Sequence, residues 1–146
     1  MSASVVYLDT SALAKWYINE SRSEDFASWI QGEADVHIST LTVVEMRCLL
    51  ARRRRNHELS IDLEQKVYAT LQDDIAKGFL TIHRVDDEQV IEALNLISLL
   101  TNHPLRTLDA IHISIARSVG ADCLATADTV MGNAAEELGM KVILFN

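Results

Sequence analysis

Apolar residues follow two alternating patterns along this sequence: short, mainly apolar runs, and longer segments in which they recur every three or four positions. The short runs occupy residues 5–8, 36–39, 80–83, 122–125 and 142–145. Their length and β-branched content predict strands that are buried on both faces of a sheet. The longer segments begin near residue 11 and then cover residues 24–31, 42–54, 63–75, 86–101, 107–119 and 129–138. Their period predicts helices that alternate with the strands.

Several predicted helices carry their own signals for a start, an end or a buried face. Ser21 and Glu24 have the spacing of a capping box, and Gly78 and Gly139 are placed to end two of the helices. Two amphipathic stripes are expected to face inward: Leu63, Val67, Leu71 and Ile75 in one helix, and Val90, Leu94 and Ile97 in another. The helix at 107–119 is apolar on most sides, so we expect it to be central.

Repeated strand–helix–strand units predict an α/β fold in which helices cover both faces of a parallel sheet. The chain has 146 residues, which is the length of one domain, so we expect a single domain over residues 1–146. In such sheets, ligands bind beyond the carboxyl ends of the strands, at the point where the strand order reverses. Residues that directly follow strands are therefore the first candidates for chemistry.

Composition excludes several classes of protein. Tight turns are scarce because the chain has 5 Gly and 1 Pro, which argues against an all-β sandwich or barrel. Two cysteines, Cys48 and Cys123, are too few for a disulfide framework; we expect both to be buried thiols in a reducing compartment, the cytoplasm. No apolar run is long enough to cross a bilayer, so no membrane partner is expected. The net charge of −8 means that any binding of nucleic acid depends on a local basic patch or on bound cations.

Four acidic residues stand where a parallel sheet would bring them to one edge. Asp9 directly follows the first predicted strand and Asp128 the fourth. Glu45 lies in the first turn of the helix after the second strand, and Asp109 opens the central helix. Each has a structural explanation by itself: Glu45 would complete a capping box with Thr42, and the aspartates would cap helices or interact with a helix dipole. Those explanations leave the clustering of all four unaccounted for.

Four ionised carboxylates at one edge require a compensating charge. Two like charges roughly 4 Å apart repel by about 4 kcal/mol at an effective dielectric near 20. Divalent cations with oxygen ligands supply the opposite charge, and Mg²⁺ typically takes a few carboxylates while it keeps several waters. A metal-bound water yields hydroxide near neutral pH, and paired ions stabilise both the attacking and the leaving oxygen of a phosphodiester displacement. No glycine-rich phosphate loop, zinc-type spacing or Ser-His-Asp order competes with this interpretation.

At these residues the sequence resembles the PIN-domain family, and within it the VapC-type toxin ribonucleases of bacterial and archaeal toxin–antitoxin pairs. The matching segments are residues 5–13 (VVYLDTSAL), 38–45 (ISTLTVVE), 105–112 (LRTLDAIH) and 125–128 (ATAD). They cover essentially the whole chain, in the order and spacing of the family. The resemblance implies a three-layer α/β/α sandwich with a central parallel five-stranded sheet. It also implies an endoribonuclease that depends on Mg²⁺ or Mn²⁺, is neutralised by a cognate VapB-type antitoxin and often forms a homodimer.

Carried over by position, the resemblance implies a catalytic and metal-binding set made of Asp9, Glu45, Asp109 and Asp128. Asp9 and Asp109 would be the firmest metal ligands. Glu45 would be a ligand or would orient the attacking water, and Asp128 would lie further out or near a second ion. Three hydroxyl residues would support the site through hydrogen bonds: Thr10, Ser11 and Thr126. Because all four acids are present, nothing suggests an inactive homologue.

Three arginines are candidate contacts for RNA or for a protein partner. Arg52 and Arg53 belong to a run of four arginines. Its plain explanation is positive charge at the carboxyl end of a helix, and the alternative is contact with RNA or with an acidic partner segment. Arg106 would touch a phosphate or only be solvated. His112, three residues after Asp109, is expected to be a hydrogen-bonded interior histidine, with proton transfer as the alternative.

Trp16 and Tyr17 follow the first motif on its helix. They would line a groove for the antitoxin or for a dimer partner, or else pack in the core. An exposed apolar groove along the helices between residues 61 and 100 would suit an amphipathic antitoxin segment.

Two other classes of function stay open. A PIN-domain nuclease could process or degrade RNA without an antitoxin, and a small antitoxin gene beside this one would separate the two cases. A non-catalytic module could use the acidic edge to hold a structural cation or a partner. A phosphatase-like or receiver-like protein is a poorer match, because Ser11 stands where a second aspartate would be needed.

Overall fold

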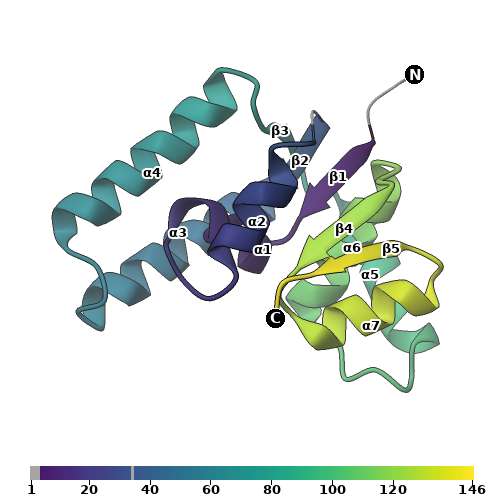
Figure 1. Cartoon of the computed structure of the whole chain (residues 1–146). Coiled ribbons are helices and arrows are strands. Elements are labelled where there is room, and N and C mark those ends of the chain that lie inside the picture. The colour runs from purple at the N-terminus through teal and green to yellow at the C-terminus, as the bar shows by residue number, and fades with distance from the viewer. Residues whose placement is uncertain (1–3, 34) are drawn as a thin grey trace.

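The computed structural model describes residues 4–33 and 35–146, and its described residues include a sheet of five strands (Figure 1). The strands are β1 (Val5–Leu8), β2 (Asp35–Ser39), β3 (Thr81–His83), β4 (Cys123–Thr126) and β5 (Lys141–Leu144). Their order across the sheet is β3-β2-β1-β4-β5, and every neighbouring pair is parallel. The predicted parallel sheet is therefore confirmed, with strand bounds within one residue of those expected.

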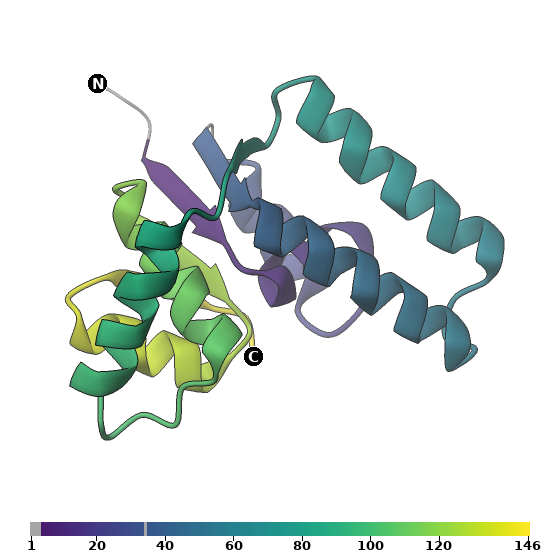
Figure 2. The ribbon, with the colours of Figure 1, turned by 180° about the vertical axis from the view of Figure 1, so that it is seen from behind.

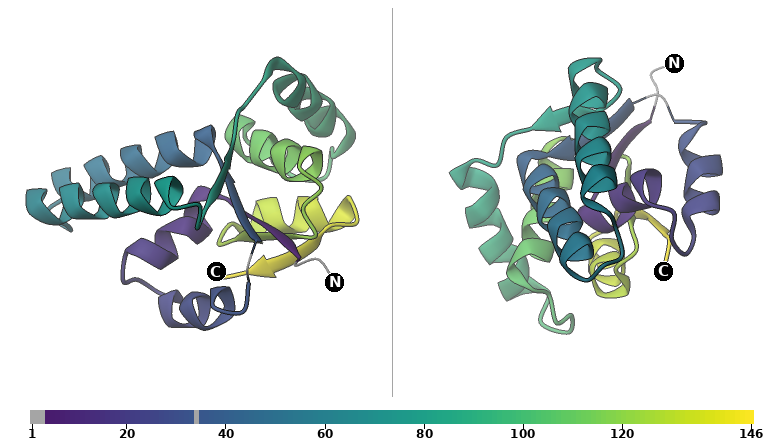
Figure 3. Two further views of the ribbon diagram at one scale, coloured as in Figure 1. Left: turned by 90° about the horizontal axis from the view of Figure 1, so that it is seen from above. Right: turned by 90° about the vertical axis from the view of Figure 1, so that its left-hand side faces the viewer.

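Within the described residues, seven helices cover the sheet: α1 (Thr10–Tyr17), α2 (Ser23–Ile30), α3 (Thr40–Arg55), α4 (Ile61–Ala76), α5 (Asp87–Leu99), α6 (Thr107–Ser118) and α7 (Thr129–Glu137). The group α1 to α4 packs on one face and the group α5 to α7 on the other, which confirms the α/β/α sandwich (Figures 1 and 2). The long helices α3 and α4 lie side by side and project beyond the sheet (Figure 3). None of the described helices combines the length and apolar character needed to cross a membrane.

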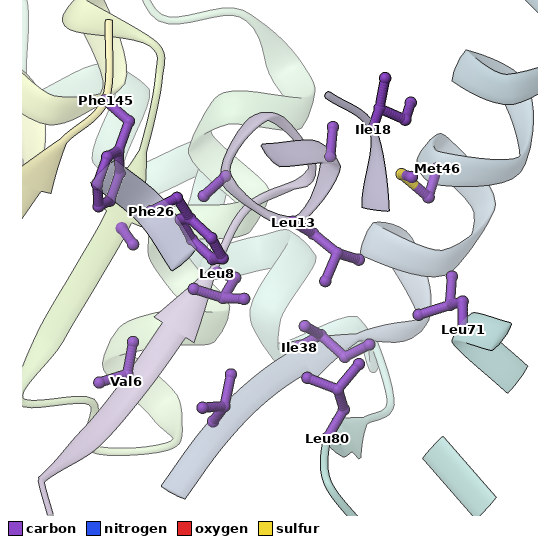
Figure 4. Packing of buried hydrophobic residues seen from close by; sticks show 14 of the residues in the cluster. Val6, Leu8, Leu13, Ile18, Phe26, Ile38, Met46, Leu71, Leu80 and Phe145 are labelled. Carbon is purple, nitrogen blue, oxygen red and sulfur yellow. The ribbon is translucent and has the colours of Figure 1, made fainter. Parts of the chain in front are cut away.

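The alternation of side chains along β1 divides the core into two clusters. Val6 and Leu8 point toward α1 to α4 and pack in the cluster that also holds Leu13 and Ile38 (Figure 4). Tyr7 points to the other face and packs with Leu124, under α5, α6 and α7. Successive residues of a strand alternate in this way, so β1 contributes to both layers. As predicted, α6 is central: its residues 109–116 are all buried.

The sheet reverses its order between β1 and β4. From β1 the chain moves outward through β2 to β3, then returns to place β4 on the other side of β1 and β5 beyond it. The carboxyl ends of β1 and β4 thus flank the point at which parallel sheets bind ligands. Asp9 follows β1 directly and lies next to Ala125 of β4, whose carbonyl accepts a hydrogen bond from the Asp9 amide at 3.3 Å.

The structural explanations hold for the three aspartates and fail for Glu45. Asp109 lies in the first turn of α6, and its Oδ2 accepts a hydrogen bond from the Arg106 amide at 3.2 Å. Asp9 caps α1, and Asp128 caps α7. The capping box at the start of α3 pairs Ser39 with Thr42, not Thr42 with Glu45. Glu45 therefore lies in the second turn of α3, and its carboxylate is not used in capping.

Two local predictions are wrong. The capping box at Ser21 is absent: the residue before α2 is Arg22 in the left-handed region, with φ 68°, and the Ser23 hydroxyl accepts from the Glu20 amide and donates to the Ile18 carbonyl. Cys123 is buried as expected, but Cys48 is exposed. Cys48 lies on the side of α3 that faces away from Met46 and Leu50, the residues that α3 buries in the core.

The predicted inward stripe of α5 also faces outward. Val90, Leu94 and Ile97 are 46%, 65% and 42% exposed, whereas Ala93 and Leu96 pack against α6. Because α5 is apolar nearly all round, its sequence period does not select one face. In α4, Val67 and Leu71 are buried as predicted but Leu63 is 45% exposed; its neighbour Glu64 turns inward instead and pairs with arginines of α3.

Candidate active site

A pocket of about 560 Å³ opens at the carboxyl edge of the sheet, and all four predicted acids line it. Asp9 comes from the β1–α1 junction, Glu45 from α3, Asp109 from α6 and Asp128 from the start of α7. Thr10 and Ser11 also line the pocket. Residues separated along the chain by successive gaps of 36, 64 and 19 positions are brought together because each directly follows a strand or lies in the first two turns of a helix at this edge.

Asp9 is the most deeply placed of the four. Its side chain is held by three groups: the Ser11 hydroxyl donates to both carboxylate oxygens (2.8 and 2.9 Å), the Thr126 hydroxyl donates to Oδ2 (2.6 Å), and the Ala12 amide donates to Oδ1 (2.9 Å). Burial raises the pKa of Asp9, and the His112 charge and these hydrogen bonds offset that effect only in part. The ionised carboxylate is thus under-compensated by the protein.

Ser11 and Thr126 also bond to the backbone that follows β4. The Ser11 hydroxyl accepts from the Ala127 amide at 2.8 Å, and the Thr126 hydroxyl accepts from the Asp128 amide at 2.9 Å. The two hydroxyls therefore join the end of β4 to the carboxylate that follows β1. Their hydrogen bonds fix the rotamer of Asp9 and the backbone that presents Asp128.

Glu45 is held through one oxygen only. The Thr10 hydroxyl donates to its Oε1 at 2.9 Å, and His112 Nε2 forms a hydrogen bond with the same atom. Partial burial raises the pKa of Glu45, but the hydrogen bond and charge of His112, with smaller contributions from Thr10 and Arg106, lower it below its usual value. Glu45 is thus held as a carboxylate, and among the described residues nothing donates a hydrogen bond to Oε2.

Arg106 lies between the two remaining acids. Its Nε is 3.5 Å from Asp109 Oδ2, and its Nη2 is 3.8 Å from Asp128 Oδ2. The arginine side chain is 82% exposed, so these long contacts are screened by solvent and easily exchanged. The sequence predicts that cations alone supply the compensating charge, whereas in the structure Arg106 shares in it.

The donor set fits a divalent cation that prefers oxygen ligands. Glu45 Oε2 and Asp109 Oδ1 accept no hydrogen bond from the described residues, and Asp128 Oδ2 has only the long contact with Arg106. Hard cations such as Mg²⁺ bind one or two carboxylates of this kind and keep their waters. Within the described part of the chain, however, no three His, Cys, Asp or Glu side chains already stand close enough to hold an ion. A cation would therefore replace Arg106 at the carboxylates.

The residue that sequence reasoning missed is Tyr7. Its hydroxyl, fully buried beneath the pocket, lies 2.8 Å from His112 Nδ1 and 2.9 Å from Ser39 Oγ. His112 is the hydrogen-bonded interior histidine that was expected, but its second partner is a site carboxylate. One signal was available in the sequence: a tyrosine inside a strand buried on both faces must find a partner for its hydroxyl.

The arginine run separates into different roles. Arg52 lines the pocket. Arg53 instead pairs with Glu20 at 2.7 Å and Glu58 at 3.3 Å, away from the acids, and Arg54 pairs with Glu64 at 2.8 Å. Only the arginine nearest the pocket is thus placed for a ligand there. The remaining walls are partly apolar, since Val44 and Leu108 line the pocket and are 60% and 43% exposed.

An acidic pocket at the reversal point of a parallel sheet, built on two strand ends and two helices, is the arrangement of a PIN domain, and the chain belongs to the PIN-domain family. The family model described as PIN domain matches residues 6–137. Among curated relatives, the ribonuclease VapC46 of Mycobacterium tuberculosis (strain ATCC 25618 / H37Rv) is 32% identical over 141 residues, which cover 94% of this chain and 95% of the relative. Ribonuclease VapC35 of Mycobacterium tuberculosis is 24% identical over 144 residues and covers 95% of this chain and 96% of its own. The resemblance to VapC-type proteins is therefore confirmed.

Solved structures agree on the fold. The crystal structure of Mycobacterium tuberculosis VapC20, described as a Sarcin-Ricin loop cleaving toxin, has a TM-score of 0.71 at 17% identity and covers 88% of this chain and 94% of its own. A DNA-bound VapBC from Salmonella typhimurium has a TM-score of 0.66 at 16% identity, over 98% of this chain and 99% of that one. At these identities the likeness concerns the fold alone.

Proposed function

We propose that this protein is an endoribonuclease, dependent on Mg²⁺ or Mn²⁺, that acts in the cytoplasm as the toxin of a VapBC-type pair. One observation carries the proposal: four carboxylates from four separate elements line a single pocket at the reversal point of the sheet. Three of them keep an oxygen that accepts no close hydrogen bond from the residues the structure describes. Relatives named as VapC ribonucleases, aligned over nearly the full chain, supply the reaction class.

The residues of the pocket have distinct tasks in this proposal. Asp9, Asp109 and Glu45 would hold the cations, with Asp128 further out, and the cations would supply the charge that stabilises the attacking and leaving oxygens. Thr10 and His112 hold Glu45 so that Oε2 faces the pocket, which suits it to orient a water. Arg52 and Arg106 supply the positive charge near a bound phosphate. These side chains provide a local patch that compensates for the acidic net charge.

A second hollow is the site proposed for the antitoxin. It has a volume of about 510 Å³, lies between α1, α2, α4 and the β3 edge, and is lined mainly by apolar residues, among them Trp16, Phe26 and Phe79. Glu33 and Asp74 add negative charge to the lining. This chemistry matches an amphipathic helix with apolar anchors and a basic residue beside them. Several structural neighbours are toxin–antitoxin complexes, which supports a VapB-type occupant.

The outward face of α5 is the surface proposed for a homodimer. Five of its apolar residues are more than two-fifths exposed: Val90, Ile91, Leu94, Ile97 and Leu99. Exposed apolar patches of this kind mark interaction surfaces, and such a face can pair with its own copy across a two-fold axis. Sedimentation equilibrium should show a dimer for the wild type and a monomer for Leu94→Asp. A Leu94→Asp protein that stays dimeric would remove α5 from the interface.

A titration with Mn²⁺ tests the catalytic proposal against the binding alternative. Melting temperature and cleavage of a mixed RNA pool are measured on the same samples, starting from EDTA. We expect both to rise over the same range of Mn²⁺ concentration, because the same carboxylates serve binding and catalysis. Stabilisation without cleavage across varied RNAs would favour a non-catalytic metal-binding module.

The choice between a toxin and an antitoxin-independent RNase depends on a separate observation. Brief expression of the wild type should arrest growth and create new RNA ends, both of which should disappear when the cognate antitoxin is co-expressed. New RNA ends without growth arrest, and no antitoxin gene beside this one, would favour a role in RNA processing or decay.

A further inference from the structure

The hydrogen bonds beneath the pocket form one continuous chain across three elements. It runs from Ser39, at the start of α3, to Tyr7 in β1, then to His112 in α6 and on to Glu45 in α3. The side chains of Ser39 and Tyr7 are fully buried, and His112 is 2% exposed. Hydrogen-bonded groups in such a position have no water to replace a missing partner.

Both ring nitrogens of His112 take part in this chain. Glu45 is held as a carboxylate and can only accept, so His112 donates to it from Nε2–H. The other nitrogen, Nδ1, lies 2.8 Å from the Tyr7 hydroxyl, and that hydroxyl lies 2.9 Å from Ser39 Oγ. The His112 ring therefore has one hydrogen-bond partner on each side, Tyr7 and Glu45.

Glu45 needs this support more than the aspartates do. Its longer side chain has more rotamer freedom, and its backbone lies in the second turn of α3 instead of at a strand end. Thr10 and His112 both hold Oε1, which leaves Oε2 directed to the pocket by exclusion. Among the described residues, Tyr7 and Glu45 are the side chains that bond to the ring nitrogens of His112, so Tyr7 is the partner that orients the ring toward Glu45.

We propose that Tyr7 is a positioning residue, which sets the ring orientation of His112 and through it aims the Glu45 carboxylate at the metal and water of the active site. The inference rests on the proposed metal-dependent nuclease function, and it assigns a role to a residue that does not touch the pocket. Partners of this kind, one step removed from a metal ligand, typically affect metal affinity or activity by about 10–100-fold.

The variant Tyr7→Phe tests the role, because it removes one hydroxyl and keeps the ring that packs in the core. Mn²⁺ affinity of the RNA-free protein, measured by calorimetry, should fall by about tenfold, and the single-turnover cleavage rate at saturating Mn²⁺ should fall similarly. The matched control is Tyr17→Phe, which removes a different hydroxyl, a partly buried one that donates to Asp74. It should leave Mn²⁺ affinity and the cleavage rate unchanged.

A double-variant cycle separates positioning from general destabilisation. In a Glu45→Gln background, Tyr7→Phe should have no further effect on Mn²⁺ affinity, because the residue through which it acts is already changed. An equal loss in both backgrounds, or a Tyr7→Phe affinity equal to that of the wild type, would overturn the proposal. If Tyr7→Phe does not fold, as judged by circular dichroism, His112→Gln takes its place in the same cycle, with the same expected non-additivity.

A readout that needs neither metal nor RNA keeps this inference distinct from the proposed function. The imidazole N–H resonance of His112 in EDTA should shift in Tyr7→Phe and stay in place in Tyr17→Phe. A wild type that neither binds Mn²⁺ nor cleaves RNA would contradict the nuclease proposal while the resonance still tests the hydrogen-bond chain. If the wild type cleaves RNA but the His112 resonance does not shift in Tyr7→Phe, only the positioning role is contradicted.

Discussion

The acidic pocket and the apolar groove have similar volumes, about 560 and 510 Å³, and consecutive residues of one segment line them both. Leu8 ends β1 on the side of the groove, while Asp9 begins the pocket; along α1, Thr10 and Ser11 face the pocket, and Leu13 and Trp16 face the groove. A single strand–helix junction therefore serves two surfaces of opposite chemistry. The alternation of the strand and the period of the helix are sufficient to separate them.

The acidic pocket and the apolar groove differ in how much their side chains reduce the stability of the folded state. In the groove, apolar side chains such as Phe79, 66% exposed, lack only a covering partner. In the pocket, a carboxylate that is 3% exposed is held by hydroxyl groups and one backbone amide, and its raised pKa records an unfavourable ionised state. A buried carboxylate whose ionised form is unfavourable is typical of a site that binds a ligand and not of one that stabilises the fold. The comparison predicts that changes in one hollow leave the other unaffected.

The largest expected effect is the loss of cleavage in Asp9→Asn. Removal of a metal-binding carboxylate should cost several kcal/mol of transition-state stabilisation, and thus lower RNA cleavage by at least about 10³-fold. Binding of the cognate antitoxin should not change. The measurement is cleavage of radiolabelled RNA in Mn²⁺, with antitoxin affinity determined in parallel.

Asp122→Asn is the matched control for that change. Asp122 lies at the opposite edge of the sheet, where its carboxylate accepts a hydrogen bond from the Val5 amide at 2.8 Å. The variant should cleave RNA like the wild type. Wild-type activity in Asp9→Asn, or lost activity in Asp122→Asn, would contradict the assignment of the pocket.

A substitution in the apolar groove should weaken antitoxin binding and leave RNA cleavage unchanged. Trp16, 44% exposed in the lining, has the properties of an interface anchor, so Trp16→Ala should weaken antitoxin binding by about 2 kcal/mol, or roughly 30-fold, without an effect on cleavage. Ile61→Ala changes an apolar side chain that is 60% exposed and lines neither hollow, and it should leave both properties intact. Calorimetric titration with the antitoxin measures the difference. Equal affinities for the two variants would exclude the groove as the docking site.

Arg106→Ala should have opposite effects on the affinity of the pocket for RNA and on its affinity for Mn²⁺. Loss of the arginine removes positive charge near a bound phosphate, so RNA affinity should fall by about threefold to fivefold and depend less on salt. Mn²⁺ affinity should rise, because the contacts of Arg106 with Asp109 and Asp128 no longer compete with the cation. Arg117→Ala, on the same helix but paired with Glu92, provides the control. A fall in Mn²⁺ affinity would show that Arg106 supports the carboxylates instead of occupying their place.

The smallest expected effect concerns stability without metal. Because burial raises the pKa of Asp9, the folded wild type loses stability as the pH rises from the usual value of 3.8 through the raised pKa. Asp9→Asn has no such titrating group, so its free energy of unfolding at neutral pH in EDTA should be about 1 kcal/mol higher than that of the wild type. The melting temperature should rise by about 2–4 °C as a result. The gain should shrink as the pH falls toward 3.8. Thermal melts across pH would contradict this explanation if the two proteins melted together throughout.

The sequence by itself determined the α/β class, the positions of the strands and the acidic residues that line the pocket. Short apolar runs and helical periods are local properties, and Asp9 and Asp128 each follow a strand whose direction fixes the edge on which they lie. The sequence could not determine which side of α5 faces inward, because several of its sides are apolar and only packing against α6 chooses between them.

Only the tertiary structure decided how the acids are held. Arg106 reaches Asp128 across 22 positions of sequence, and the chain from Tyr7 through His112 to Glu45 joins residues 105 and 67 positions apart. Such contacts depend on the order of strands in the sheet and on the rotamers of buried side chains. Neither property leaves a periodic trace in the sequence, since a hydrogen bond between distant residues is fixed by the packing of whole elements and not by local preference.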